Sequence, residues 1–120
     1  MSSKSLLYIV SRAPYSNAVG QEALDAILIG ASFEQAVTVL FMHDGVFQLH
    51  ANQGVGNSEL KQYTKAFDAL EDFGIAQVVC HDLSLIGRGL SQNNMMRRVD
   101  LATSEQVKTM ISKADKVFTF

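Results

Sequence analysis

Short apolar runs alternate along the chain with longer segments that have helical periodicity. The apolar runs are typical of strands, and there are five of them: 5–11, 36–42, 75–80, 95–101 and 116–120. The segments between them predict helices at 19–33, 58–73, 82–89 and 104–114. Strands separated by helices of this length favour right-handed crossovers and a parallel sheet covered on both faces. We therefore expect an α/β fold, a single three-layer αβα domain over residues 1–120 with a five-stranded parallel sheet.

Local signals mark the ends of two helices. Thr103 and Gln106 have the spacing of a capping box at the start of the last helix, and Gly74 is placed to end the helix at 58–73. The last helix should turn one set of residues inward: Val107, Met110, Ile111 and Ala114.

The second half of the first helix is apolar nearly all round. Ile29 and Phe33 lie off the stripe that should face the sheet, which consists of Ala23, Leu24, Ile27, Leu28 and Ala31. Because a surface helix of a small domain normally has a polar face, we predict that Ile29 and Phe33 are buried against another subunit. Enclosure by loops of the same chain is the alternative.

Apolar side chains also follow the Asp44-Gly45 turn signal. Val46, Phe47 and Leu49 come directly after it, in what should be an exposed loop at the edge of the sheet. Exposed side chains of this size predict an interface with a partner protein. The alternative is a loop that folds back and closes the top of the core.

Charge and cysteine content exclude several classes of protein. A formal net charge of -2 argues against direct nucleic-acid binding, and the only adjacent basic pair, Arg97-Arg98, is typical of a solvated surface. One cysteine cannot form an internal disulfide, which favours a reducing cytoplasmic compartment. The apolar run Leu6 to Val10 is too short for a signal peptide or a membrane span, so we expect no membrane association.

Cys80 is the candidate catalytic residue. It ends the third predicted strand, and chemistry in parallel sheets gathers at the carboxyl ends of the strands. The start of the following short helix would lower the pKa of a thiol, Arg88 would assist if it folded back, and Asp82 would oppose both effects. A thiolate in this position is suited to accept sulfur as a persulfide.

Other chemistries fit less well. The first loop lacks the glycines of a phosphate-binding loop, having only Gly20, and Cys80 and Arg88 are separated by seven residues where a phosphatase loop needs five. His81 should point to the opposite side of the strand from Cys80 and so cannot act as its base. His43, Asp44, His81 and Asp82 lack any metal-ligand spacing, and we expect no metal and no cofactor.

Three segments together carry a resemblance to a known family: APYSNAVGQEALDAILIGASFEQAVTVLFMHDGVFQL, GRGL and the terminal DKVFTF. The chain resembles the TusC/DsrF branch of the DsrE-like family over nearly its whole length. The resemblance implies a five-stranded parallel α/β fold and membership of a hetero-oligomer with TusB-like and TusD-like sister subunits, arranged as a dimer of heterotrimers. It implies a cytoplasmic sulfur relay from a TusA-like donor to a TusE-like acceptor, toward 2-thiolation of the tRNA wobble uridine. In sulfur-oxidising bacteria, related DsrE, DsrF and DsrH subunits serve sulfur oxidation.

The resemblance also bears on Cys80. In the family the persulfide carrier belongs to the TusD/DsrE-type subunit, and VCHDLSLIGRGL is similar to that setting at Val79, Cys80, Arg88 and Gly89, with one extra residue before the arginine. The TusC/DsrF branch is not defined by such a cysteine. Three hypotheses stay open: an accessory subunit of a sulfurtransferase complex, a thiol enzyme that uses Cys80 itself, and a homo-oligomeric small-molecule binding module.

Overall fold

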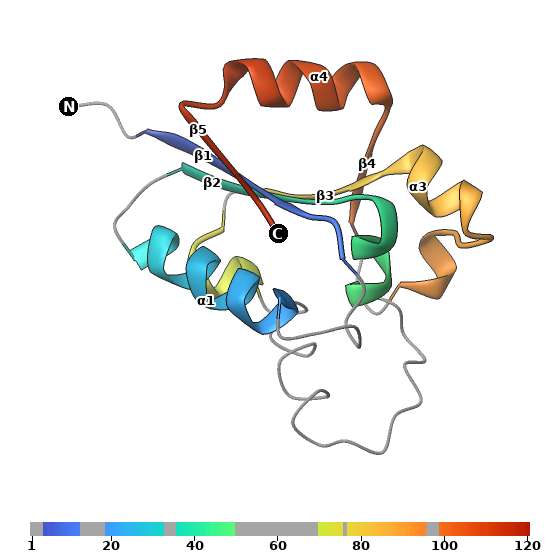
Figure 1. The fold of residues 1–120 in the computed structure, drawn as a ribbon, viewed down its shortest axis with the longest axis horizontal. Coiled ribbons are helices and arrows are strands. Elements are labelled where there is room, and N and C mark those ends of the chain that lie inside the picture. The colour runs from blue at the N-terminus through green and yellow to red at the C-terminus, as the bar shows by residue number, and fades with distance from the viewer. Residues whose placement is uncertain (1–3, 13–18, 33–35, 50–69, 76, 96–98) are drawn as a thin grey trace.

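A five-stranded parallel sheet forms the centre of the structure. The computed structural model describes residues 4–12, 19–32, 36–49, 70–75, 77–95 and 99–120. All strand pairs are parallel and the spatial order is β4-β3-β2-β1-β5, so β5 pairs with β1 on the far side from β2 (Figure 1). The strands are β1 (Ser5–Val10), β2 (Ala36–Phe41), β3 (Gln77–His81), β4 (Asp100–Ala102) and β5 (Lys116–Thr119). The predicted five-stranded parallel sheet is confirmed.

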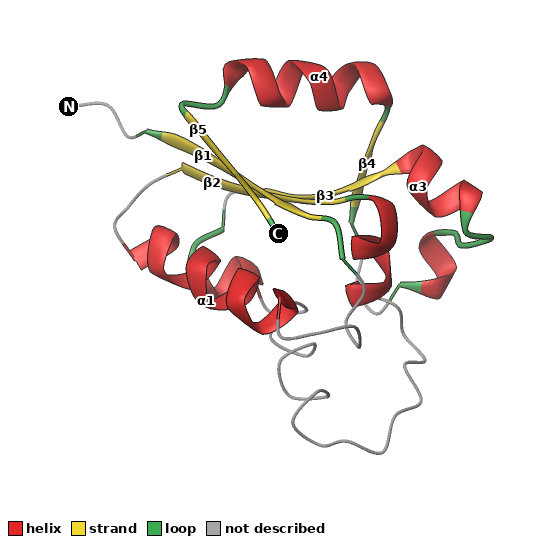
Figure 2. Cartoon of the chain, in the orientation of Figure 1, coloured by secondary structure: helices red, strands yellow, loops and turns green. Residues whose placement is uncertain are grey.

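Helices lie on both faces of this sheet. Helix α1 (Val19–Ser32) packs on one face and α4 (Ser104–Lys113) on the other, and α3 (Asp82–Gly87) follows the carboxyl end of β3 (Figures 1 and 2). Short 3₁₀ helices complete the α1 side: η1 (His43–Leu49), η2 (Leu70–Phe73) and η3 (Gln92–Asn94). The three-layer α/β architecture is therefore as predicted. In the described ranges, no helix is both long and apolar enough to span a membrane.

The central strands are buried on both faces, which explains why they are apolar without alternation. The α1 side holds one cluster, which includes Val10, Val39, Phe41, Cys80, Ala23, Leu24 and Ile27. The α4 side holds a second cluster of Leu7, Ile9, Leu40, Val79, Ala102 and Val107. Burying one such Val, Leu, Ile or Phe side chain contributes roughly 1.5–3 kcal/mol, so the sheet is fixed from both sides.

The predicted helix-end signals are present in the described residues. Thr103 Oγ1 accepts a hydrogen bond from the Gln106 amide at 3.2 Å, and Gln106 Oε1 accepts one from the Thr103 amide at 2.8 Å, so the capping box is confirmed. Gly74 follows η2 with a φ of 87°, a conformation that favours glycine. Residues 58–69 of the predicted second helix lie outside the described residues, and Leu70–Phe73 form η2. In α4, Val107 is buried but Ile111 is exposed, so the inward orientation predicted for Ile111 is wrong.

The fourth strand was expected at residues 95–101. Residues 96–98 lie outside the described residues, and β4 spans Asp100–Ala102, so in the described part of the chain it begins later and ends one residue later than predicted. The Val99 amide donates to the side chain of Gln92 at 3.4 Å instead of joining the ladder with β3. The preceding Gln92–Asn94 form η3.

The segment after β2 also differs from the prediction. Val46 and Leu49 are 0% exposed, so their expected exposure at a partner surface is wrong, and the segment folds back onto the core as η1. Gly45 makes this approach possible: its amide donates to the Met42 carbonyl at 2.9 Å, and a Cβ at this position would collide with the carbonyl group of Val10. Only a glycine fits against the end of β1 here.

Candidate functional site

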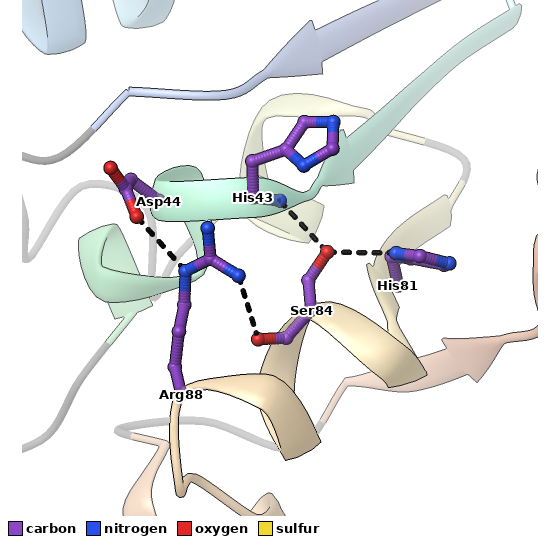
Figure 3. Close-up of polar contacts among 5 residues, drawn as sticks. All are labelled: His43, Asp44, His81, Ser84 and Arg88. Atoms are coloured by element: carbon purple, nitrogen blue, oxygen red, sulfur yellow. Dashed lines mark hydrogen bonds and ion pairs between the residues drawn. The ribbon is translucent and has the colours of Figure 1, made fainter.

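The carboxyl ends of β2 and β3 bring two segments together. Helix η1 follows β2 and α3 follows β3, and polar side chains from both meet between them (Figure 3). We call this group the edge network; it consists of His43, Asp44, His81, Ser84, Arg88 and Ser104. Two segments near this edge, residues 13–18 after β1 and residues 50–69 after η1, lie outside the described residues.

Ser84 is the centre of the edge network. Its hydroxyl oxygen accepts a hydrogen bond from the backbone amide of His43 at 2.8 Å and lies 2.7 Å from Nδ1 of His81. His43 has a φ of 51°, uncommon for a residue with a side chain, and its imidazole points away from Ser84 (Figure 3). The left-handed turn at His43 therefore presents a main-chain donor to α3.

His81 links α3 to α4. Its Nε2 lies 2.8 Å from the hydroxyl of Ser104, the first residue of α4, while Nδ1 contacts Ser84. A neutral ring with its proton on Nε2 satisfies both contacts, because Ser84 then donates to Nδ1 and Nε2 donates to Ser104. The hydroxyls of Ser84 and Ser104 thereby hold both ring nitrogens of His81.

Arg88 closes the network on the other side of α3. Its Nε donates to Asp44 Oδ1 at 2.9 Å, and its Nη1 donates to the Ser84 carbonyl at 3.2 Å (Figure 3). The arginine folds back along α3, but its partners are an acidic side chain and a main-chain carbonyl.

The Ser84–His81 contact has the distance of a nucleophile and its base. Ser84 is only 4% exposed, however, and its hydroxyl is engaged by both His43 and His81. A substrate cannot reach that oxygen in this conformation. The edge network therefore serves to hold α3, η1 and the start of α4 in place.

Cys80 lies next to the last residue of β3, close to the strand end predicted, but it faces the core. It is 0% exposed, belongs to the α1-side cluster, and pairs in register with Phe41 and Leu101. The neighbouring His81 reaches α4, on the opposite side of the sheet, which agrees with the expectation that it is not a base for Cys80. A thiol in this position is not accessible to a sulfur donor.

The residues predicted to form interfaces fall into three groups. Ile29 on α1 is 60% exposed, so loops of its own chain do not enclose it. Phe47 is half-buried, next to the fully buried Val46 and Leu49. Phe33 lies outside the described residues. Among these, Ile29 has the exposure that an interface requires, and the interface itself stays a prediction.

A groove in the described part of the chain lies away from the edge network. It has a volume of about 370 Å³ and runs between α4 and strands β3 and β4, with Val79 and Met110 among its apolar lining and Asp100 and Glu105 among its acidic lining. Neither Cys80 nor Ser84 lines it. Within the described part of the chain, no group of three His, Cys, Asp or Glu side chains is placed to hold a metal ion.

The similarity of this chain to known proteins extends over nearly its whole length. The model of the DsrE/DsrF-like family matches residues 4–120. The chain belongs to the DsrE/DsrF-like family. Its predicted resemblance to the TusC/DsrF branch is confirmed, because it is 30% identical to the intracellular sulfur oxidation protein DsrF of Allochromatium vinosum, over 98% of this chain and 96% of that one. It is also 32% identical to a TusC homolog from Pseudomonas aeruginosa, over 98% of each chain.

A solved structure shows the same fold for this DsrE-like chain. The crystal structure of the ychN protein from E. coli superposes with a TM-score of 0.77 over 99% of this chain and 100% of that one, at 21% sequence identity. This structural similarity supports the five-stranded parallel α/β fold of the chain.

Sequence reasoning missed two members of the edge network, Ser84 and Ser104. The spacing of His81 and Ser84, three residues apart at the start of a helix, was a weak local signal for their contact. No local signal links His81 to Ser104, because that contact depends on where α4 lies on the sheet.

Proposed function

We propose that this DsrE-like chain is a TusC-type subunit of a multi-subunit sulfur-relay complex. The observation that carries the proposal is its relationship, over almost its full length, to chains named TusC and DsrF. The family resemblance supplies the expected setting: TusB-like and TusD-like sister subunits, a TusA-like donor, a TusE-like acceptor, a cytoplasmic location, and 2-thiolation of the tRNA wobble uridine as the end product.

Within this complex we assign the chain an accessory role. Persulfide exchange requires the attacking thiolate to reach the outer sulfur of its donor. Cys80 is enclosed in the core, and the surrounding edge network fixes α3 beside it. The chain then contributes surfaces to the complex, and a sister subunit carries the sulfur.

Helix α1 offers one such surface. Ile29 is exposed, whereas Ala23, Leu24 and Ile27 on the same helix are buried against the sheet. A sister subunit that covers Ile29 would account for the excess of apolar residues in this helix.

The alternative is a DsrF-like role in sulfur oxidation. The relative from Allochromatium vinosum, whose name includes sulfur oxidation, is as similar to this chain as the TusC proteins are. A third possibility, a sulfurtransferase that uses Cys80, requires β3 and α3 to separate so that the thiol becomes accessible.

Deleting the gene in its host tests the pathway. The proposal expects the 2-thiolated wobble uridine in total tRNA to fall, and a plasmid copy to restore it, as measured by mass spectrometry of nucleosides. Normal thiolation together with lost sulfur oxidation would favour the DsrF-like role instead. Normal levels of both would contradict a sulfur-relay function.

Affinity purification tests the complex itself. A tagged wild-type chain should co-purify with sister DsrE-like subunits, and Ile29→Asp should lose them. Glu22→Gln, an exposed change on the same helix, is the matched control and should retain them. Equal recovery of sister subunits with Ile29→Asp and Glu22→Gln would exclude α1 as the interface.

A further inference from the structure

Strand β5 is an open edge of the sheet. It pairs only with β1 among the described strands, and all four of its residues are exposed. Val117 and Phe118 are each 40% exposed although they are apolar. An edge strand of this kind presents main-chain donors and acceptors that can pair with another strand.

The hydrogen bonds to β1 determine which groups of β5 face outward. The Phe120 amide donates to the Ile9 carbonyl at 2.8 Å, and the Ser11 amide donates to the Phe120 carbonyl at 2.7 Å. Both main-chain groups of Phe120 therefore face β1. Because this orientation alternates along a strand, Phe118 also faces β1, while Val117 and Thr119 turn their N–H and C=O groups away from the sheet.

We propose that β5 pairs antiparallel with β5 of a second copy of this chain, about a twofold axis at Phe118. A twofold axis allows only registers in which a residue lies opposite itself. Centred on Phe118, the pairing sets Val117 opposite Thr119 of the second copy and Thr119 opposite its Val117. Both pairs have outward-facing main-chain groups, so each exchanges two N–H···O bonds.

The other symmetric registers are poorer. Centred on Val117, the pairing would need Asp115 to bond across the interface, but the Asp115 amide already donates to the Ser5 carbonyl at 2.9 Å. Centred on Thr119, it would leave Val117 without an opposite residue in the strand. The register centred on Phe118 is the one that uses both outward-facing residues of the strand.

Side chains favour the same register. Phe118 lies opposite itself in a non-hydrogen-bonded pair, the type in which side chains come closest, and aromatic pairs at such positions are favourable. Phe118 already stacks on Tyr8 with ring centroids 5.0 Å apart, so its ring is held at the face of the sheet where the second ring would pack. The charged Lys116 residues of the two copies lie at opposite ends of the pairing and do not meet.

The second edge of the sheet is less suited to this role. Among the described residues, strand β4 comprises three residues, Asp100–Ala102, and Asp100 is exposed. Short, charged edge strands resist pairing with other strands. The proposal therefore concerns β5 alone, and it does not depend on the sulfur-relay function.

Sedimentation of the full-length chain tests the dimer. We expect a concentration-dependent dimer for the wild-type chain and a monomer for Val117→Pro. Proline removes an outward-facing N–H but no bond to β1, so the sheet should tolerate it. Val117→Thr keeps the N–H and should still dimerise. A wild-type chain that stays monomeric at every concentration, or a Val117→Pro variant that dimerises like wild type, would overturn the proposal.

Disulfide trapping tests the register and does not require any variant to lose dimerisation. Phe118→Cys should form a cross-linked dimer on mild oxidation, because the two Cβ atoms would be about 4.5–5.5 Å apart. In Thr119→Cys the two Cα atoms would lie on the order of 8 Å apart, beyond the reach of a disulfide, so it should not cross-link. The wild-type chain, whose only cysteine is buried, is the control. No cross-link with Phe118→Cys, or a cross-link to a different protein in cell extract, would overturn pairing with a second copy.

Discussion

The hydroxyl oxygen of Ser84 lies 2.7 Å from Nδ1 of His81 and ties the first turn of α3 to the end of β3. The same oxygen accepts the amide of His43, so one buried hydroxyl joins the segments that follow two neighbouring strands. The carboxyl edge of the sheet, where Cys80 was the candidate for a reactive thiol, is therefore fixed by a hydrogen-bonded network.

Removing the Ser84 hydroxyl should destabilise the chain. Ser84→Ala leaves the His43 amide and the His81 ring without this partner, at a cost of about 1–3 kcal/mol in the free energy of unfolding. Urea denaturation followed by circular dichroism measures the change. Ser112→Ala is the matched control, since Ser112 is exposed and its hydroxyl donates to the Thr109 carbonyl of its own helix, and it should change stability by less than about 0.5 kcal/mol. Equal stability of the two variants would show that the network does not hold the edge.

Gly45 is required by the close approach of η1 to β1. Gly45→Ala places a methyl group against the main-chain carbonyl of Val10, which cannot move without disturbing the sheet, so we expect a loss of about 1–3 kcal/mol or more. Gly87→Ala, in α3, meets no atom within 4 Å and should be neutral or slightly stabilising. Thermal denaturation of the pair checks this, and a Gly45→Ala variant as stable as Gly87→Ala would mean that η1 does not pack as described.

Tyr8 should make the free energy of unfolding of the chain fall as the pH rises in the alkaline range. Burial raises the pKa of Tyr8 above its ordinary value of 10.0. Because the folded-state pKa is the higher one, this contribution to stability is fully present below the ordinary value and is lost as the pH rises through the raised value. The free energy of unfolding of the wild type should therefore fall more steeply in that range than that of Tyr8→Phe, which keeps the ring beside Phe118 but cannot ionise. Parallel curves for the two proteins would exclude the effect.

Much of the fold was predictable because the local patterns and the final burial agree. The strands at Ser5–Val10 and Ala36–Phe41 are buried on both faces, so their runs of apolar residues gave the correct prediction. The capping box at Thr103 was also predictable, because both of its hydrogen bonds lie within four consecutive residues. The start of β4 was harder to predict, because the amide of Val99, just before the strand, donates to the side chain of Gln92, a contact that the strand pattern does not reveal.

The candidate site was harder to predict. Cys80 was placed correctly at a strand end, but its burial depends on which face of β3 is turned toward α1, and one apolar strand with both faces covered does not reveal that. Val46 and Leu49 follow a turn signal that is typical of exposed loops. Their burial depends on the fit of Gly45 against Val10, a contact between distant parts of the chain.

The buried position of Cys80 predicts that its thiol reacts slowly in the native chain. A water-soluble thiol reagent should modify the native chain at least about 10³-fold more slowly than the unfolded chain, because access requires the core to open. The rate should rise with urea as the native state is depleted. A native rate close to that of the unfolded chain would show that the thiol is accessible, and the sulfurtransferase alternative would then gain support.

The most direct test of the accessory role is the level of thiolated wobble uridine in cells that carry Cys80→Ala as their only copy of this chain. Alanine suits the buried, apolar position better than serine, which would place a hydroxyl in the core. With protein abundance matched by immunoblot, we expect thiolation equal to that of the wild type and well above that of the deletion strain. Thiolation as low as in the deletion strain would contradict the accessory role and assign the sulfur to Cys80.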